Sequence, residues 1–400
     1  MTRDVYILLV AQFLTAFADN ALLFTAIHMA QSGSHPAPWY IPALQASFLV
    51  AFVLLAPWVG PYADRRPKAR VLVTGNIIKA IGAGLMLMHI EPLLSYAVVG
   101  IGAAIYGPAK YGVLPELVGP ERLVTANGWI EGSTILAILL GMYSGAMVAE
   151  YSVAAALALV LALYVVSALC ARLMAQLAPL PRPSVPALRN FGTAMQRLLS
   201  TPRARFATLG VSLFWGVSAV LRVLLVAWIP AVLLIHESSK IAEMTMFLAV
   251  GIAIGAMLAP RFVPLAYLRR ARWAAYAMGS LVLMLSAVET VSVARVVLLC
   301  AGVAGGLLVV PINAALQEIG HHSVGAGGAV AIQHFFENLA MMVASGLYAV
   351  AAAGGAAPVP ALIVLGVTVV TATVWLSLRL PPDTGRWQDL IPDVDTRHRP

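Results

Sequence analysis

Long apolar runs separated by short polar turns make up most of the chain. Twelve can be marked, at about residues 5–30, 39–62, 71–89, 93–113, 124–148, 152–178, 206–236, 241–262, 271–289, 291–316, 325–354 and 358–380. A helix needs about 20 mainly apolar residues to cross a bilayer, so each run predicts one transmembrane helix. The first run is long and is preceded by little positive charge, so we expect it to be retained rather than cleaved as a signal peptide.

The composition agrees with a chain that lies in lipid. Apolar residues make up 61% of it and charged residues 10%, and the mean hydropathy is +0.89. Soluble domains have about 45–50% apolar and about 25% charged residues. We therefore predict an all-α polytopic membrane protein.

Basic residues mark one side of the predicted membrane. The turns after the second, sixth and eighth runs are rich in Lys and Arg, whereas the odd-numbered turns offer only Lys240 and Arg295. The positive-inside rule then places both termini and the central loop in the cytoplasm. The formal net charge of +8 follows from these turns, which face anionic lipid, so no nucleic-acid partner is expected.

The chain is predicted to consist of two similar halves. A Pro-rich stretch, 179–186, lies at its midpoint and is typical of a linker. Several residues recur at an offset of roughly 200 positions: Asp19 with Arg222, Pro108 with Pro311, Glu116 with Glu318, and Glu131 with Glu337. Such an offset is expected of a parallel repeat of six helices, in which substrate sites lie between the halves. The predicted boundaries are 1–178 for an N-terminal six-helix bundle, 179–205 for a cytoplasmic linker, 206–380 for a C-terminal six-helix bundle and 381–400 for a cytoplasmic tail.

Charged residues inside the runs are candidates for function. Asp19 and Arg222 each lie in the middle of an apolar run. An ionised side chain there costs about 2.5–3.5 kcal/mol on insertion scales, so it should face a partner, a cavity or a substrate. Arg222 is the candidate partner of Asp19. Lys110, at the end of the fourth run, can offer a cation to a phosphate, although a lysine at a helix end also commonly extends to the interface.

The fifth and eleventh runs each carry a carboxylate inside the predicted helix, Glu131 and Glu337. Gln333 lies four positions before Glu337 and shares its face, which we expect to look toward a central cavity. The adjacent His321 and His322 are placed in a loop, and no histidines occur four apart on a helix, so no metal or cofactor is predicted. No Ser/His/Asp set has a recognisable context, so an enzyme is not predicted.

Residues 60–70 read Gly-Pro-Tyr-Ala-Asp-Arg-Arg-Pro-Lys-Ala-Arg and resemble the signature loop of the major facilitator superfamily. A small residue there lets helices approach closely, Asp64 can cap a neighbouring helix N-terminus, and the basic cluster holds the loop at the cytoplasmic face. Together with the runs and the repeat, this resemblance implies the major-facilitator fold, with twelve transmembrane helices in two six-helix halves.

Five further blocks resemble one family of that superfamily, the bacterial lysophospholipid transporters. They are residues 11–24, 106–112, 126–135, 212–222 and 310–338, spread over nearly the whole chain. Ala18 stands where a glycine is expected, His334 stands where an asparagine is expected, and the tail extends past the usual end. The resemblance implies a flippase of the Gram-negative inner membrane that moves lysophosphatidylethanolamine and lysophosphatidylglycerol from the outer to the cytoplasmic leaflet.

The resemblance also implies a partner and an energy source. A cytoplasmic acyltransferase that uses acyl-carrier protein would restore the second acyl chain. Neither ATP nor an obligatory sodium or proton gradient would be needed, and we expect a monomer. The predicted substrate-binding residues are Asp19, Asn20, Lys110, Glu131, Arg222, Gln333 and Glu337. Arg222 and Lys110 suit the lipid phosphate, and one of the carboxylates suits an ethanolamine amine.

Two alternatives stay open at this point. Asp19 and Arg222 could pair as a gate for which the head group competes, rather than bind the substrate. The protein could also be a proton-coupled major-facilitator efflux pump for drugs or other amphiphiles, with Asp19 or Glu337 as the proton carrier.

Overall fold

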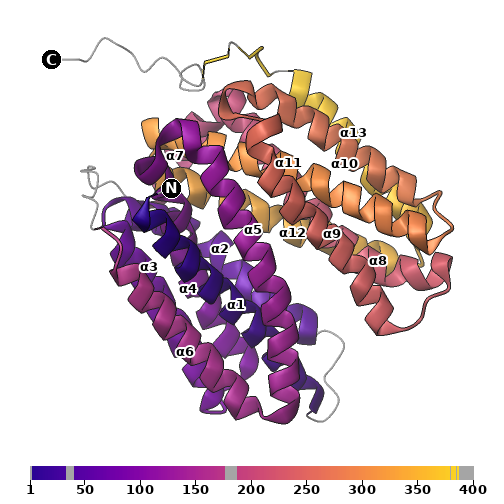
Figure 1. The fold of residues 1–400 in the computed structure, drawn as a ribbon, viewed down its shortest axis with the longest axis horizontal. Helices are drawn as coiled ribbons and strands as arrows, with labels where there is room; N and C mark the ends of the chain where they lie inside the picture. The colour runs from indigo at the N-terminus through magenta and orange to yellow at the C-terminus, as the bar shows by residue number, and fades with distance from the viewer. Residues whose placement is uncertain (1, 33–39, 176–186, 379, 384, 387–400) are drawn as a thin grey trace. The chain divides into compact units, whose positions relative to one another are not determined.

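The computed structural model describes residues 2–32, 40–175, 187–378, 380–383 and 385–386. Every regular element in these ranges is a helix (Figure 1). The helices are α1 Arg3–Ser32, α2 Tyr40–Asp64, α3 Lys68–Leu87, α4 Pro92–Gly112, α5 Leu114–Tyr151, α6 Val153–Arg172, α7 Ala187–Ser200, α8 Pro202–Leu233, α9 Ser238–Phe262, the 3-10 helix η1 Leu265–Arg270, α10 Ala271–Leu285, α11 Val291–His322, α12 Ala326–Ala353 and α13 Pro358–Leu378.

Each predicted run overlaps one helix, which confirms the all-α membrane architecture. Within the described residues, eleven helices are long and apolar enough to cross a membrane. The predicted run at 271–289 corresponds to α10, which has 15 residues. At 1.5 Å per residue it reaches about 22 Å, short of a hydrocarbon core of about 30 Å.

Several helix ends differ from the prediction. Helix α5 begins at Leu114, ten residues before the predicted run at 124–148, and its backbone is not helical at Gly119, which has a positive φ of 67°. Helix α11 extends to His322, and both His321 and His322 lie in its last turn. The prediction that they lie in a loop was therefore wrong. Hydropathy ends a predicted helix where polar residues begin, but buried polar residues continue the helix when they find hydrogen-bond partners.

The predicted central linker contains a helix. Its Pro-rich stretch, 179–186, lies outside the described residues, as do tail residues 387–400. The part that follows forms α7, an amphipathic helix whose Leu198 is buried while Leu188 and Arg189 are exposed. Helix α7 therefore packs one face against the protein.

The described chain divides into two compact units. Unit 1 consists of residues Met1–Gly119, Ser133–Arg197 and Gly320–Phe335, and unit 2 of Pro120–Gly132, Leu198–Ile319 and Phe336–Pro400. Helices α5 and α12 thus contribute residues to both units. The predicted boundaries at 178, 205 and 380 stay predictions.

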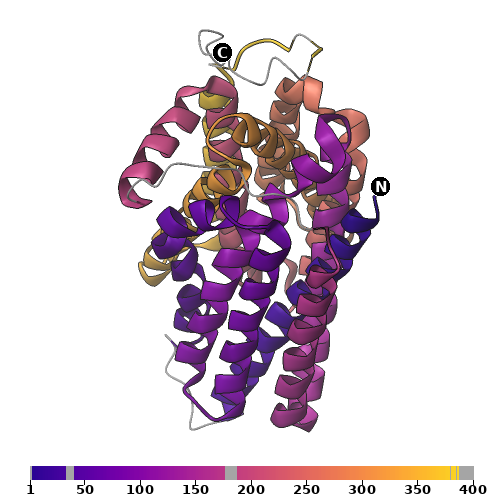
Figure 2. The same ribbon diagram turned by 90° about the vertical axis from the view of Figure 1, so that its left-hand side faces the viewer.

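In unit 1, α3 packs on α4 and α6, α2 packs on α4, and α1 packs on α6. These long helices run alongside one another in both views (Figures 1 and 2). Leu22, Met86, Val99 and Leu157 are fully or almost fully buried in the shared core. A Cβ atom on Gly141 would lie 2.4 Å from the carbonyl oxygen of Phe17, so glycine is what allows α5 to approach α1 this closely.

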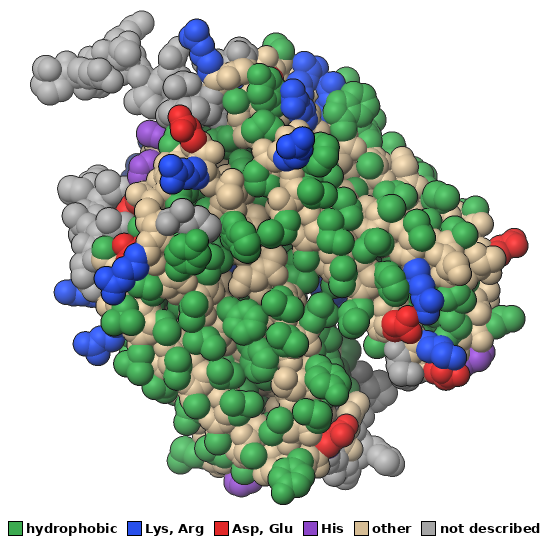
Figure 3. Space-filling view, in the orientation of Figure 1, with side chains coloured by type: hydrophobic (Ala, Val, Ile, Leu, Met, Phe, Trp, Pro, Cys, Tyr) green, Lys and Arg blue, Asp and Glu red, His purple; other side chains and the backbone are tan. Residues whose placement is uncertain are grey.

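In unit 2, α13 packs on α8 and α10, and α8 packs on α9. Trp228 and Leu224 of α8 are fully buried in this core. A Cβ atom on Gly255 would lie 2.1 Å from the carbonyl oxygen of Val303. The backbones of α9 and α11 are therefore in direct contact, which only a glycine permits. Hydrophobic side chains are spread over much of the face shown in Figure 3, as expected for helices that face lipid.

Candidate functional site

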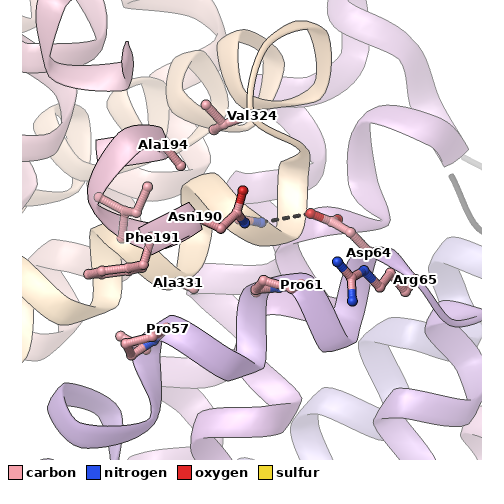
Figure 4. Close-up of a pocket in the computed structure, with 13 residues that line it drawn as sticks. Pro57, Pro61, Asp64, Arg65, Asn190, Phe191, Ala194, Val324 and Ala331 are labelled. Carbon is pink, nitrogen blue, oxygen red and sulfur yellow. Dashed lines mark hydrogen bonds between the residues drawn. The ribbon is translucent and has the colours of Figure 1, made fainter. Parts of the chain in front are cut away.

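Asp64, at the end of α2, holds the N-terminus of α12. Its two carboxylate oxygens accept hydrogen bonds of 2.9 Å from the backbone N–H groups of Gly327 and Gly328, and the second of these is the dashed line in Figure 4. The first turn of a helix has unpaired N–H groups and partial positive charge, so an anion stabilises it. Lys68 lies 2.8 Å from the same carboxylate, and both side chains are buried. The predicted capping role of Asp64 is confirmed.

A small pocket adjoins this contact, and α7 forms one of its walls. Asn190, Phe191 and Ala194 of α7 line it together with α2 and the start of α12 (Figure 4). The Phe191 ring also packs edge-on against Phe335 of α12, with centroids 5.7 Å apart. Helix α7 therefore lies beside the first turns of α12.

Asp19 lies in α1 and has partners within unit 1. Its Oδ2 is 2.7 Å from the ammonium of Lys79, and its Oδ1 accepts a 2.8 Å hydrogen bond from the hydroxyl of Tyr164. Lys79 also donates to the hydroxyl of Thr15 at 3.1 Å. Sequence reasoning missed Lys79, although a lysine inside the third apolar run is as unusual as an aspartate inside the first.

The network continues through buried polar groups of α1, α3 and α6. Thr15 donates to the side-chain oxygen of Asn76 at 2.8 Å, and Asn76 donates to Ser167 at 2.9 Å. Ser167 then donates to the backbone carbonyl of Ala11 at 2.7 Å. Each polar group here is hydrogen-bonded, which fixes the relative positions of the three helices.

Lys110 is buried near the end of α4, with its ammonium 3.9 Å from the centroid of the Tyr111 ring. His334 of α12 packs edge-on against Tyr111 and Phe52, with centroids 6.0 and 5.5 Å apart. A Cβ atom on Gly107 would lie 2.5 Å from the His334 ring, so this glycine makes room for the histidine. Lys110 thus lies in an aromatic part of unit 1.

Glu131 belongs to a buried polar cluster in unit 2. It accepts a 3.3 Å hydrogen bond from the side-chain amide of Asn313 on α11. One turn earlier on α5, Asn127 exchanges two hydrogen bonds with Gln317, at 2.9 and 2.8 Å. The amides of α11 therefore hold residues 127–131 of α5 in register, and Asn313 positions Glu131.

This amide pair gives a stability prediction. Asn127→Leu should lower the Tm of the purified protein, because it leaves the buried amide of Gln317 without its partner at a cost of about 1–3 kcal/mol. The double variant Asn127→Leu, Gln317→Leu should regain part of the loss, since neither amide is then unpaired. A double variant whose loss equals the sum of the single losses would contradict the pairing.

The other predicted residues are distributed over both units. Asn20 of α1 donates to the backbone carbonyl of Ala16 at 2.8 Å. Gln333 and Glu337 of α12 are both buried, at 2% and 6% exposure. Arg222 is exposed on α8, beside the buried Leu221 of the unit 2 core. In unit 1 the structure describes Asp19, Asn20, Lys110 and Gln333, and in unit 2 Glu131, Arg222 and Glu337.

Comparison with known proteins agrees with this architecture. The family model of the Major Facilitator Superfamily matches residues 8–345. Among solved structures, a bacterial homologue of the iron transporter ferroportin in an outward-facing state superposes with a TM-score of 0.77, at 17% identity, covering 97% of this chain and 100% of that one. The E. coli fucose:proton symporter FucP (N162A) gives 0.73 at 16% identity, covering 94% and 98%. These structures show the fold.

Closer relatives are found among curated proteins. The lysophospholipid transporter LplT of Photorhabdus laumondii is 41% identical over 352 residues, which cover 87% of this chain and 88% of the relative. The lysophospholipid transporter LplT of Klebsiella pneumoniae is 41% identical over 373 residues, covering 92% and 94%. The chain has the major-facilitator fold, and its 41% identity to these relatives over about nine-tenths of its length shows that it belongs to the lysophospholipid transporter family of the Major Facilitator Superfamily.

Proposed function

We propose that the protein moves lysophospholipids, lysophosphatidylethanolamine and lysophosphatidylglycerol, from the outer to the cytoplasmic leaflet of a bacterial inner membrane. The observation that carries the proposal is the 41% identity, over nine-tenths of the chain, to relatives named as lysophospholipid transporters. Both termini lie in the cytoplasm, as the positive-inside rule indicates. The protein acts as a monomer, and a cytoplasmic acyltransferase that uses acyl-carrier protein consumes the lipid it delivers.

Arg222 is the proposed phosphate-binding residue. It is exposed on α8 among apolar residues, including the exposed Val223 and Val226. An arginine on a membrane-spanning helix is costly in lipid and favours an aqueous path or an anionic ligand. Its guanidinium can bind two phosphate oxygens at once, which a lysine cannot do. Lys110 supplies a second cation.

Three carboxylates are available for the positive end of an ethanolamine head group: Asp19, Glu131 and Glu337. Asn313 donates a hydrogen bond of 3.3 Å to Glu131, and both oxygens of Asp19 are held by Lys79 and Tyr164. Asn20 and Gln333 add hydrogen-bonding groups beside these charges.

The driving force can be tested in spheroplasts that contain the protein and an acyltransferase. Externally added lysophosphatidylethanolamine should still be converted to the two-chain lipid after a protonophore collapses the proton gradient, because reacylation keeps the inner concentration of the lysolipid low. The measurement is the appearance of labelled two-chain lipid, with acyl supply maintained. Loss of conversion while the acyltransferase is active in lysate would favour a proton-coupled efflux pump instead.

A further inference from the structure

Lys79 is a buried cation close to the middle of α3. Its side chain is 2% exposed and its ammonium lies 2.7 Å from Asp19 Oδ2. The ammonium also faces the rings of Tyr106 and Tyr164, with centroids 5.0 and 5.8 Å away. A buried ammonium is costly unless it is paired, and here a carboxylate, a hydroxyl of Thr15 and two aromatic faces surround it.

Asp19 is the accessible member of this pair. Its side chain is 19% exposed, against 2% for Lys79. A polar ligand can therefore approach the carboxylate while the ammonium stays behind it. Tyr164 holds the second carboxylate oxygen, so the carboxylate is fixed at both oxygens and its charge is balanced from inside unit 1.

We infer that Lys79 is a positioning and specificity-determining residue, which fixes the Asp19 carboxylate and cancels its charge so that a lipid head group meets an electroneutral polar site. The inference rests on the proposed lysophospholipid transport. Lysophosphatidylethanolamine has no net charge, and lysophosphatidylglycerol has one negative charge. A neutral pair does not discriminate between them by charge, whereas an unbalanced carboxylate or ammonium does.

The test compares initial rates of transbilayer movement for the two lipids in proteoliposomes. Lys79→Met leaves a net negative site and should raise the ratio of the ethanolamine rate to the glycerol rate roughly tenfold. Asp19→Asn leaves a net positive site and should lower that ratio by a similar factor. The double variant Asp19→Asn, Lys79→Met is neutral again and should return the ratio to within about twofold of wild type.

The double variant separates this inference from direct amine recognition by Asp19. A carboxylate that binds the amine is absent from the double variant, so the ratio would stay low if amine binding were its role. Lys79→Arg retains the charge and should keep the wild-type ratio. Lys68→Met is the matched control, because it also removes a buried lysine of α3 that pairs with an aspartate; both lipid rates should then change by the same factor.

The outcomes are distinguishable. A wild-type protein that moves neither lipid overturns the proposed function. A wild-type protein that moves both, with a ratio that does not shift in Lys79→Met and Asp19→Asn, overturns the role of Lys79 alone. If Lys79→Met fails to fold, Asp19→Asn and the neutral double variant carry the test, and a ratio that remains low in the double variant overturns the inference.

Discussion

Arg222→Ala is expected to reduce lysophospholipid movement at least tenfold, to near the rate of protein-free liposomes, with near-normal expression. The side chain is exposed on α8, whereas the neighbouring Leu221 and Leu224 form the core. Its removal should therefore leave packing intact and remove the phosphate ligand. Arg222→Lys should recover only part of the rate, because an ammonium cannot bind two phosphate oxygens in the guanidinium geometry.

The matched control is Arg295→Ala. Arg295 also belongs to unit 2, but it pairs with Glu243 at 2.7 Å and lies outside the proposed site. The Arg295→Ala variant should retain most of the wild-type transport rate, as measured by back-extraction of a labelled lysolipid from the outer leaflet. Wild-type activity in Arg222→Ala would remove this residue from the mechanism.

Asp64→Ala is the second substitution with a large expected effect. It removes the acceptor of two backbone N–H groups of α12 and leaves Lys68 buried without its partner. Breaking a buried ion pair costs about 3–5 kcal/mol. A free-energy change of that size shifts a two-state population by roughly two to four orders of magnitude. The conformation in which the end of α2 contacts the N-terminus of α12 should become rare. The rate of lysolipid movement should then fall at least tenfold.

Arg66→Ala is the control for this loop. Arg66 is exposed and bonds only to Tyr62 among the described residues, at 3.1 Å. Removing it changes the loop charge without changing the helix cap, so the transport rate should stay within about twofold of wild type, as for most surface substitutions. Equal rates for Asp64→Ala and wild type would show that the capped state is not part of the transport cycle.

Much of the architecture could be predicted from the sequence. Apolar runs long enough to cross a bilayer predict the membrane helices. The charged loop at 60–70 predicts the helix cap that Asp64 forms. Helix ends were less predictable, because hydropathy does not register helices that continue through buried polar residues such as Gln317 and Glu318 of α11. The adjacent histidines at 321 and 322 were misplaced for this reason.

The sequence identified candidate site residues by their type, as charged or polar residues inside apolar runs. It did not predict which residues they contact. Asp19 could be recognised because an aspartate is rare in an apolar run. Its partner Lys79 obeys the same rule and was overlooked because repeat symmetry directed attention to Arg222. Helix α7 was also missed: it has only 14 residues, in which polar and apolar residues are mixed, so it does not form an apolar run, and Leu198 is buried only because other helices lie beneath it. Such contacts depend on tertiary structure, which a one-dimensional pattern does not contain.

Purified protein in liposomes without ATP or any ion gradient offers the most direct test of lysophospholipid transport. Labelled lysophosphatidylethanolamine is placed in the outer leaflet, and its loss from that leaflet is followed with time. The account predicts chemically unchanged lipid that crosses much faster than in protein-free liposomes and in liposomes with Arg222→Ala. No movement above that background, or movement that requires an imposed proton gradient, would contradict it.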